Sequence, residues 1–220
     1  MNKLKTILCT VVAIAGFTSV SNAASLNGVY LEVGTSAVGV AVDGSATDTG
    51  SNSTTVGTVG KTAVTASYGL GYMTSRSNKL GLDLGYLVIP GEAKIARTSD
   101  SSLSDVTFEI SDSTEYYLAP MINISDTSSV YLKYGWNDAD VNTTGDVTKI
   151  TSLEGNTLAL GTVMSWGSNL YIRTEAGMTE YDSITAAGLG TNAVGGIGTD
   201  ESVTATPDVH YGKIAIGYKF

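Results

Sequence analysis

His210 is the single histidine of the sequence and the residue best suited to act as a general base at neutral pH. Asp208 precedes it by two positions, so on a strand both side chains share a face and the carboxylate could orient the imidazole. Such a pair activates a serine hydroxyl in ester hydrolysis. No serine close to His210 is singled out by its spacing, and Gly212 occupies the position two residues after the histidine. We therefore predict that His210 is a histidine at the rim of the fold and that the protein has no catalytic residue.

Two other segments have the composition of ligand-binding loops, but neither completes its motif. Residues 138–142 begin like a calcium loop, yet Thr143 stands where the sharp turn requires glycine and no glutamate follows at the twelfth position. Residues 188–198 are rich in glycine, but no basic residue follows them to bind a phosphate. The only cysteine, Cys9, belongs to the N-terminal apolar segment described below. We predict no metal site and no cofactor.

A third set of residues consists of charged side chains inside segments that alternate apolar and polar residues. Each of the seven stands at the opposite parity from its apolar neighbours: Glu32, Asp83, Glu115, Lys133, Arg173, Glu175 and Lys213. If this face is enclosed, the four acids and three bases must be paired. We therefore expect an interior network of salt bridges, with Glu175 and Lys213 as one pair.

The segments that carry these charges are predicted to be β-strands, because alternate residues of a strand point to opposite faces. Eight segments keep one parity apolar: residues 29–36, 64–72, 80–88, 115–124, 130–137, 158–166, 170–178 and 211–220. No charged residue interrupts any of these apolar faces. A soluble sandwich or ligand-carrying barrel places its apolar face inward and its charges outside. Other features must therefore decide which face is inside.

The lengths of the connections and the positions of the aromatic residues both favour an apolar exterior. Short links at residues 75–78, 125–129 and 167–169 alternate with long ones near 43–60, 91–112, 138–151 and 182–206. This asymmetry is typical of a transmembrane β-barrel. Aromatic residues on the apolar faces gather at both strand ends, as at the two interfaces of a bilayer. They are Tyr72, Trp166, Tyr218 and Phe220 near the short links, and Tyr86, Tyr116, Tyr134 and Trp136 toward the long ones.

The N-terminus predicts export. Lys3 and Lys5 precede a mostly apolar run, and small residues fit a signal peptidase site with cleavage after Ala23. The run is too short to span a membrane as a helix. We assign residues 1–23 to a signal peptide and 24–220 to one barrel domain. Without the two lysines the net charge falls from −9 to −11, and such an acidic chain argues against a nucleic acid partner.

The last predicted strand carries apolar side chains at two-residue steps up to the last residue: Ile214, Ile216, Tyr218 and Phe220. With its even strand number, its aromatic girdles and this terminal strand, the chain resembles the eight-stranded outer-membrane proteins. It is similar to the transmembrane part of outer membrane protein A and to its single-domain relatives. Since the sequence ends at Phe220, we do not carry over the peptidoglycan-binding domain of the full-length family.

The resemblance implies an all-β fold, an antiparallel up-and-down barrel in the outer membrane of a Gram-negative cell envelope. Short periplasmic turns and long extracellular loops would connect its transmembrane β-strands. The terminal strand, with Ile214, Ile216, Tyr218 and Phe220, would be the signal that the barrel assembly machinery recognises.

An eight-stranded barrel is only wide enough for side chains to fill it. Inward positions alternate large and small residues: Tyr30, Tyr117, Tyr131, Tyr171 and Tyr211, with Gly69, Gly71, Gly85, Gly135, Gly161, Gly177 and Gly217. We expect the rings to lie across neighbouring backbone, and we expect no continuous water channel. Pro120 cannot donate to the ladder and predicts a bulge or weakened pairing in its strand.

We interpret the protein as a non-enzymatic outer-membrane scaffold, a monomer that contacts membrane lipid and lipopolysaccharide and presents acidic, polar loops to the outside. Divalent ions could link such loops to anionic lipopolysaccharide. Two alternatives stay open. One is a narrow or gated, porin-like pore for small solutes, opened by re-pairing of the interior charges. The other is a lipid A-modifying enzyme that uses His210, although lipid A deacylases carry serine where this sequence has Gly212.

Overall fold

The computed structural model describes residues 26–48, 53–75, 79–96, 107–144, 148–187 and 201–220. The predicted signal peptide and its cleavage after Ala23 lie outside these residues. No helix in the described part of the chain is long and apolar enough to cross a membrane. The strands are β1 (Gly28–Asp48), β2 (Ser53–Ser75), β3 (Leu80–Ala96), β4 (Thr107–Ser125), β5 (Ser128–Thr144), β6 (Ser152–Trp166), β7 (Leu170–Tyr181), β8 (Ile184–Ala187) and β9 (Glu201–Lys219).

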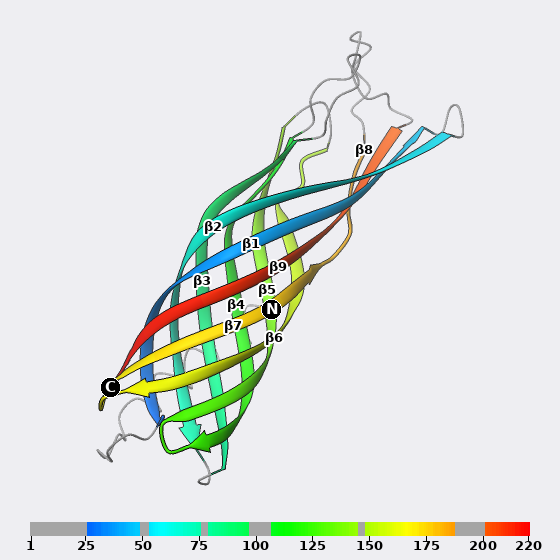
Figure 1. Cartoon of the computed structure of the whole chain (residues 1–220). Helices are drawn as coiled ribbons and strands as arrows, with labels where there is room; N and C mark the ends of the chain where they lie inside the picture. Colours follow the sequence, from blue (N-terminus) through cyan, green and yellow to red (C-terminus); the bar gives the residue numbers. More distant parts are fainter. Residues whose placement is uncertain (1–25, 49–52, 76–78, 97–106, 145–147, 188–200) are drawn as a thin grey trace, which may run out of the picture.

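Eight of these strands form a closed antiparallel ring (Figure 1). Each strand from β1 to β6 pairs with the next along the chain, β7 pairs with β9, and β9 returns to β1. The short strand β8 pairs with the first residues of β9, beyond the end of β7. The predicted eight-stranded antiparallel barrel is confirmed.

The strands are staggered around the ring. Pairing partners followed once around the barrel lead from Tyr30 on β1 back to Val40 on the same strand, ten residues further along. A closed barrel of this kind tilts its strands by about 35–45° from its axis, and the strands of Figure 1 are visibly inclined. This geometry leaves an interior that side chains can fill.

Three short connections lie at one end of the barrel, together with the C-terminus (Figure 1). They join β2 to β3, β4 to β5 and β6 to β7, as predicted. We call the part of the barrel near this end the lower barrel and the part near the other end the upper barrel.

The predicted long loops are wrong in their bounds, because the strands continue into them. β1 and β2 stay paired up to Asp48 and Ser53, so most of residues 43–60 is a hairpin. β3 and β4 continue in the same way into residues 91–112, β5 into 138–151, and β8 and β9 into 182–206. The prediction required an apolar outer face, and the outer face of these extensions is mostly polar.

In the upper barrel the two faces exchange their polarity. The inward side chains are buried and apolar, among them Val40, Val42, Ala139, Val141, Leu153 and Ala205. Their outward neighbours are exposed and polar, among them Asp43, Asp140, Glu154 and Glu180. This is the arrangement of a barrel in water. The outer surface of the upper barrel is therefore suited to contact with water, and its interior is an apolar core separate from the charged interior of the lower barrel.

Two prolines mark irregular places in the ladder. At Ala119 and Pro120, β4 has no partner on β5, although the register is the same on both sides. The weakened pairing predicted at Pro120 is confirmed. A second irregularity surrounds Pro90, where β3 shifts its register against β4 between Ile89 and Glu92.

Candidate functional site

The interior of the barrel holds the seven charged residues that the sequence analysis singled out. All seven are at most 5% exposed: Glu32, Asp83, Glu115, Lys133, Arg173, Glu175 and Lys213. They come from six strands of the ring. Buried charges are stable only when they are paired and hydrogen-bonded, and the contacts divide them into two groups.

Arg173 is the centre of the first group. Its Nη2 lies 2.7 Å from Asp83 Oδ2, and its Nε lies 3.0 Å from Glu32 Oε2. Its Nη1 donates a hydrogen bond of 3.1 Å to the Tyr117 hydroxyl, and the Tyr30 hydroxyl donates one of 2.8 Å to Asp83. Two carboxylates thus neutralise a guanidinium that has no contact with solvent.

Lys133 is the centre of the second group. Its Nζ lies 2.6 Å from Glu175 Oε1 and 2.8 Å from Glu115 Oε1. The contact with Glu115 is an ion pair without hydrogen-bond geometry. The hydroxyls of Tyr131 and Tyr211 each donate a hydrogen bond of 2.6 Å to Glu175. Glu175 is therefore saturated with donors, whereas Glu115 is not.

The expected salt bridge between Glu175 and Lys213 is absent from these buried groups. The two residues are direct cross-strand partners on β7 and β9. The Nζ of Lys213 instead lies 3.1 Å from Glu32 Oε1. The reason is that Glu175 already accepts from Lys133 and two tyrosines, so Lys213 binds the carboxylate that has an oxygen left.

Five inward tyrosines fill the space between the charges. Each faces a glycine across the ladder: Tyr30 and Gly71, Tyr117 and Gly85, Tyr131 and Gly161, Tyr171 and Gly217, Tyr211 and Gly177. A methyl group on Gly217 would overlap the Tyr171 ring, so glycine alone leaves room for it. The predicted packing of rings on backbone is confirmed. The sequence analysis missed that these hydroxyls bind the charges, although each tyrosine stands at the same parity as the charged residues.

The outer surface of the lower barrel is apolar. Leu160 and Ile216, in the middle of their strands, are 60% and 55% exposed. Rings pack along the outer surface at both ends of this zone, Tyr134 against Trp136 at 5.1 Å and Tyr218 against Phe220 at 5.2 Å between centroids. A continuous apolar belt between two aromatic girdles is covered by lipid and not by water.

The residues of the predicted assembly signal lie on this belt. Four side chains at the C-terminal end of the chain point to the outside of the barrel, and each is about half exposed: Ile214, Ile216, Tyr218 and Phe220. The backbone N–H of Phe220 donates to the carbonyl of Val29 at 2.9 Å, which extends the contact between the last strand and the first.

His210 lies on the outer face of the barrel, with Asp208 two residues earlier on the same face of β9. His210 is exposed on the outside of β9, opposite Met178 and Gly39. Within the described residues, no three His, Cys, Asp or Glu side chains are grouped so that they could hold a metal ion. Residues 138–142, which resemble the start of a calcium loop, lie inside β5.

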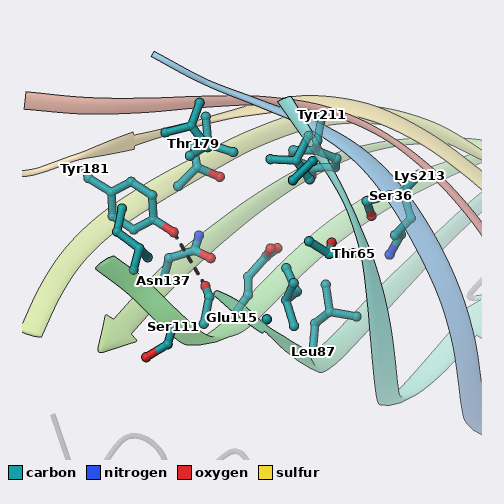
Figure 2. A pocket seen from close by; sticks show the side chains of 18 residues that line it. Ser36, Thr65, Leu87, Ser111, Glu115, Asn137, Thr179, Tyr181, Tyr211 and Lys213 are labelled. Atoms are coloured by element: carbon teal, nitrogen blue, oxygen red, sulfur yellow. Dashed lines mark hydrogen bonds between the residues drawn. The ribbon is translucent and has the colours of Figure 1, made fainter. Parts of the chain in front are cut away.

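A cavity of about 110 Å³ borders the charge groups on the side of the upper barrel (Figure 2). No pattern in the sequence predicted this cavity. Its polar lining includes Glu115, Asn137, Tyr181 and Lys213. Its apolar lining residues are Val38, Val40, Ala63, Leu87, Ile89, Ile110 and Val209. The hydroxyls of Ser113 and Tyr181 lie 3.5 Å apart at its edge.

No protein family profile and no curated protein matches the chain. Its fold is similar to that of outer membrane protein OprG from Pseudomonas aeruginosa, with a TM-score of 0.54, 14% identity, and coverage of 90% of this chain and 99% of OprG. Neisserial surface protein A gives a TM-score of 0.43 at 13% identity, covering 87% of this chain and 97% of that one. Ail of Yersinia pestis, solved with the heparin analogue sucrose octasulfate, gives 0.42 at 13% identity, covering 85% and 99%. The similarity to OprG shows that the chain has the fold of a small outer-membrane β-barrel.

Proposed function

We propose that the protein is a non-enzymatic scaffold of the outer membrane, a barrel with a closed interior that holds a polar upper barrel at the outer surface. The observation that carries this proposal is the group around Arg173. Arg173 on β7 binds Asp83 on β3, and these two strands stand on opposite sides of the ring. The hydroxyls of Tyr30 and Tyr117 meet beside this contact at 2.5 Å. Side chains thus cross the lumen where a pore would need water.

The polar surface of the upper barrel supports the second half of this proposal. Its exposed outward side chains include the acids Asp43, Asp140, Glu154, Glu180 and Asp182. Such a surface repels anionic lipopolysaccharide unless cations lie between them. We propose that divalent ions mediate its contact with lipopolysaccharide and that the barrel acts as a monomer.

Conductance in planar bilayers tests the scaffold against the pore. We expect no steady conductance from the wild-type protein. The comparison variant carries Arg173→Ala together with Asp83→Ala, which removes both members of the central pair and leaves Glu32 with Lys213. It should conduct, provided that its heat-modifiable gel mobility shows a folded barrel. Regular openings of the wild type at neutral pH would overturn the scaffold and favour the gated pore.

Mass spectra of lipid A test the absence of enzymatic activity. Cells without the protein, with the wild type and with His210→Ala should give the same lipid A species, because the exposed imidazole lies outside the barrel. A species that depends on both the protein and His210 would establish the enzyme instead.

A further inference from the structure

The wall of the barrel is open between β2 and β3 in the upper barrel. Their pairing runs from Ser75 and Gly81 up to Tyr68 and Val88 and ends there, although both strands are described beyond this point. In Figure 1 the upper part of β2 leans away with β1, whereas β3 continues upward with β4. We call this unpaired stretch the seam.

Pro90 explains why the seam begins where it does. Proline lacks the N–H that a strand inside a sheet donates, so it is found on edge strands and at bulges. Pro90 lies in the register shift of β3, and Gly91 follows it with a φ of +150°, which glycine tolerates. β3 therefore becomes an edge toward β2 just above Val88.

The cavity lies directly behind the seam. On the side of β2 its wall is formed by Ala63 and Thr65, and on the side of β3 by Leu87, Ile89 and Gly91. Side chains thus replace the backbone ladder between the cavity and the exterior. An engineered protein cavity of about 150 Å³ with apolar walls binds benzene. The cavity found here has a similar volume, about 110 Å³, so it suits an apolar group about the size of a benzene ring.

Glu115 is the polar group in this cavity that lacks a full set of partners. The other three interior acids, Glu32, Asp83 and Glu175, each accept a hydrogen bond from a tyrosine hydroxyl. Glu115 forms an ion pair with Lys133, which it shares with Glu175, and its Oε1 has no partner in hydrogen-bond geometry. Yet Glu115 is 2% exposed. A buried carboxylate in this state is costly, and a donor placed in the cavity would satisfy it.

The charge balance favours a cation as that donor. Around Lys133, the two carboxylates of Glu115 and Glu175 share one ammonium group, so this group of charges carries one excess negative charge. Glu115 is the acid with the weakest set of contacts, and it faces the cavity (Figure 2). A second unsatisfied atom, the buried hydroxyl oxygen of Thr65, lies on the same cavity wall.

We propose that the cavity is a binding site for a small amine with an apolar body, which binds Glu115 through its ammonium group and packs its body against Leu87, Ile110 and Val209. This goes beyond the scaffold role. The ligand enters along the seam, at the level where the outer aromatic girdle ends. It stops at the charge groups, because Arg173 and its partners block the lumen below. The site is therefore a pocket and not a channel.

Binding of three benzene derivatives to the folded barrel in micelles tests this site, with protein-free micelles as the blank. The probes are benzylamine, which is protonated at pH 7, neutral benzyl alcohol and anionic benzoate. We expect the wild type to bind benzylamine at least about tenfold more tightly than benzyl alcohol, because a charge-assisted hydrogen bond contributes more than a neutral one, and to bind benzoate least.

Two variants separate the carboxylate from the cavity. Glu115→Gln should lose the preference for benzylamine over benzyl alcohol, while Glu154→Gln, on the exposed face of β6, should keep it. Val38→Phe should fill the cavity and abolish binding of both probes, while Val33→Phe, on the lipid face of the same strand, should not. Equal binding of benzylamine and benzoate by the wild type overturns the proposal even if Glu115→Gln does not fold. An unchanged preference in folded Glu115→Gln overturns it as well.

Discussion

Arg173 and Asp83 stand on diametrically opposite strands of the ring, and their side chains meet at 2.7 Å. Opposite charges on neighbouring strands can pair across a sheet, but this salt bridge joins opposite walls of the barrel. The pair therefore does two things at once: it blocks the lumen, and it ties β3 to β7 independently of the ladder. Tyr30 and Tyr171 pack edge to face beside it, and the Arg173 guanidinium lies 5.3 Å and 5.8 Å from the centroids of their rings.

The first prediction concerns this tie. Arg173→Gln removes the cation from Asp83 and Glu32 and leaves two buried carboxylates short of a partner, so it should destabilise the barrel by about 3–5 kcal/mol. Urea titration of folding into lipid vesicles measures the loss. Lys149→Gln is the matched control, because Lys149 is exposed between β5 and β6 and its removal should cost almost nothing. Equal losses for the two variants would mean that the interior pair contributes nothing to stability.

The second prediction concerns the partner of Lys213. Lys213→Met and Glu32→Gln should show a coupling energy of about 0.5–3 kcal/mol in a double-mutant cycle, because their side chains are in contact. The cycle of Lys213→Met with Glu175→Gln should give a smaller value, although these two residues are nearer along the ladder. A larger coupling with Glu175 would show that the pairing described above does not persist in the membrane.

The third prediction uses two glycines of β9. Gly217→Ala should destabilise the barrel by about 1–3 kcal/mol, because the added methyl group forces the Tyr171 ring out of its position. Gly212→Ala, five residues earlier on the same strand, should have little effect, since no atom lies within 4 Å of the added group. Thermal unfolding in the same detergent compares them. Equal melting temperatures of the two variants would show that the glycine at position 217 is not needed to make room for the Tyr171 ring.

The fourth prediction concerns the lipid-facing belt. Leu160→Arg places a charge on the outer face of β6 where the strand is paired with Leu132 and Ala176, and it should cost about 2–4 kcal/mol in a bilayer. Thr151→Arg, exposed just before β6 on the side of the upper barrel, should be tolerated. Folding titrations into vesicles give both values. If Leu160→Arg lowers the folding free energy no more than Thr151→Arg does, the assignment of this face to lipid is wrong.

The fifth prediction concerns assembly. Deletion of Phe220 removes both its outward ring and its backbone hydrogen bond to Val29, so less protein should reach the outer membrane in folded form. Phe220→Tyr, which keeps the aromatic ring and the backbone bond, should assemble normally. Heat-modifiable mobility of membrane fractions reports the folded share. Normal assembly of the deleted form would show that the terminal aromatic residue is not part of the signal.

The lower barrel could be predicted from the sequence because one rule holds along all of its strands. A surface in lipid excludes charge, so each outer face reads as an uninterrupted apolar parity. The upper barrel follows the opposite rule. On β1 the valine and leucine residues stand at odd positions up to Val33 and at even positions from Val38 onward. A prediction that requires the same alternate residues to stay apolar along a strand ends at this change, so the rest of the strand is predicted to be a loop.

The sequence predicts which residues face the interior, but not which of these residues contact one another. Parity alone places Glu32, Glu175 and Lys213 on the inner face. Which acid Lys213 binds depends on the stagger of the ring and on the donors that already occupy Glu175, and neither is a property of one strand. The seam had a local signal in Pro90 and Gly91, a pair that suits an edge or a bulge better than the middle of a sheet.

The exchange of polarity between the lower and upper barrel also sets how deep the molecule sits in the bilayer. If the barrel moved outward along the membrane normal, the lipid-facing side chains of Leu160 and Ile216 would move toward water. If it moved inward, Asp140 and Glu154 would enter the hydrocarbon of the bilayer. Both movements are opposed, so hydrophobic mismatch has to be met by the lipids or by a change of tilt. A thicker membrane must thin where it surrounds this barrel. The protein thereby imposes its own hydrophobic height on its nearest lipids.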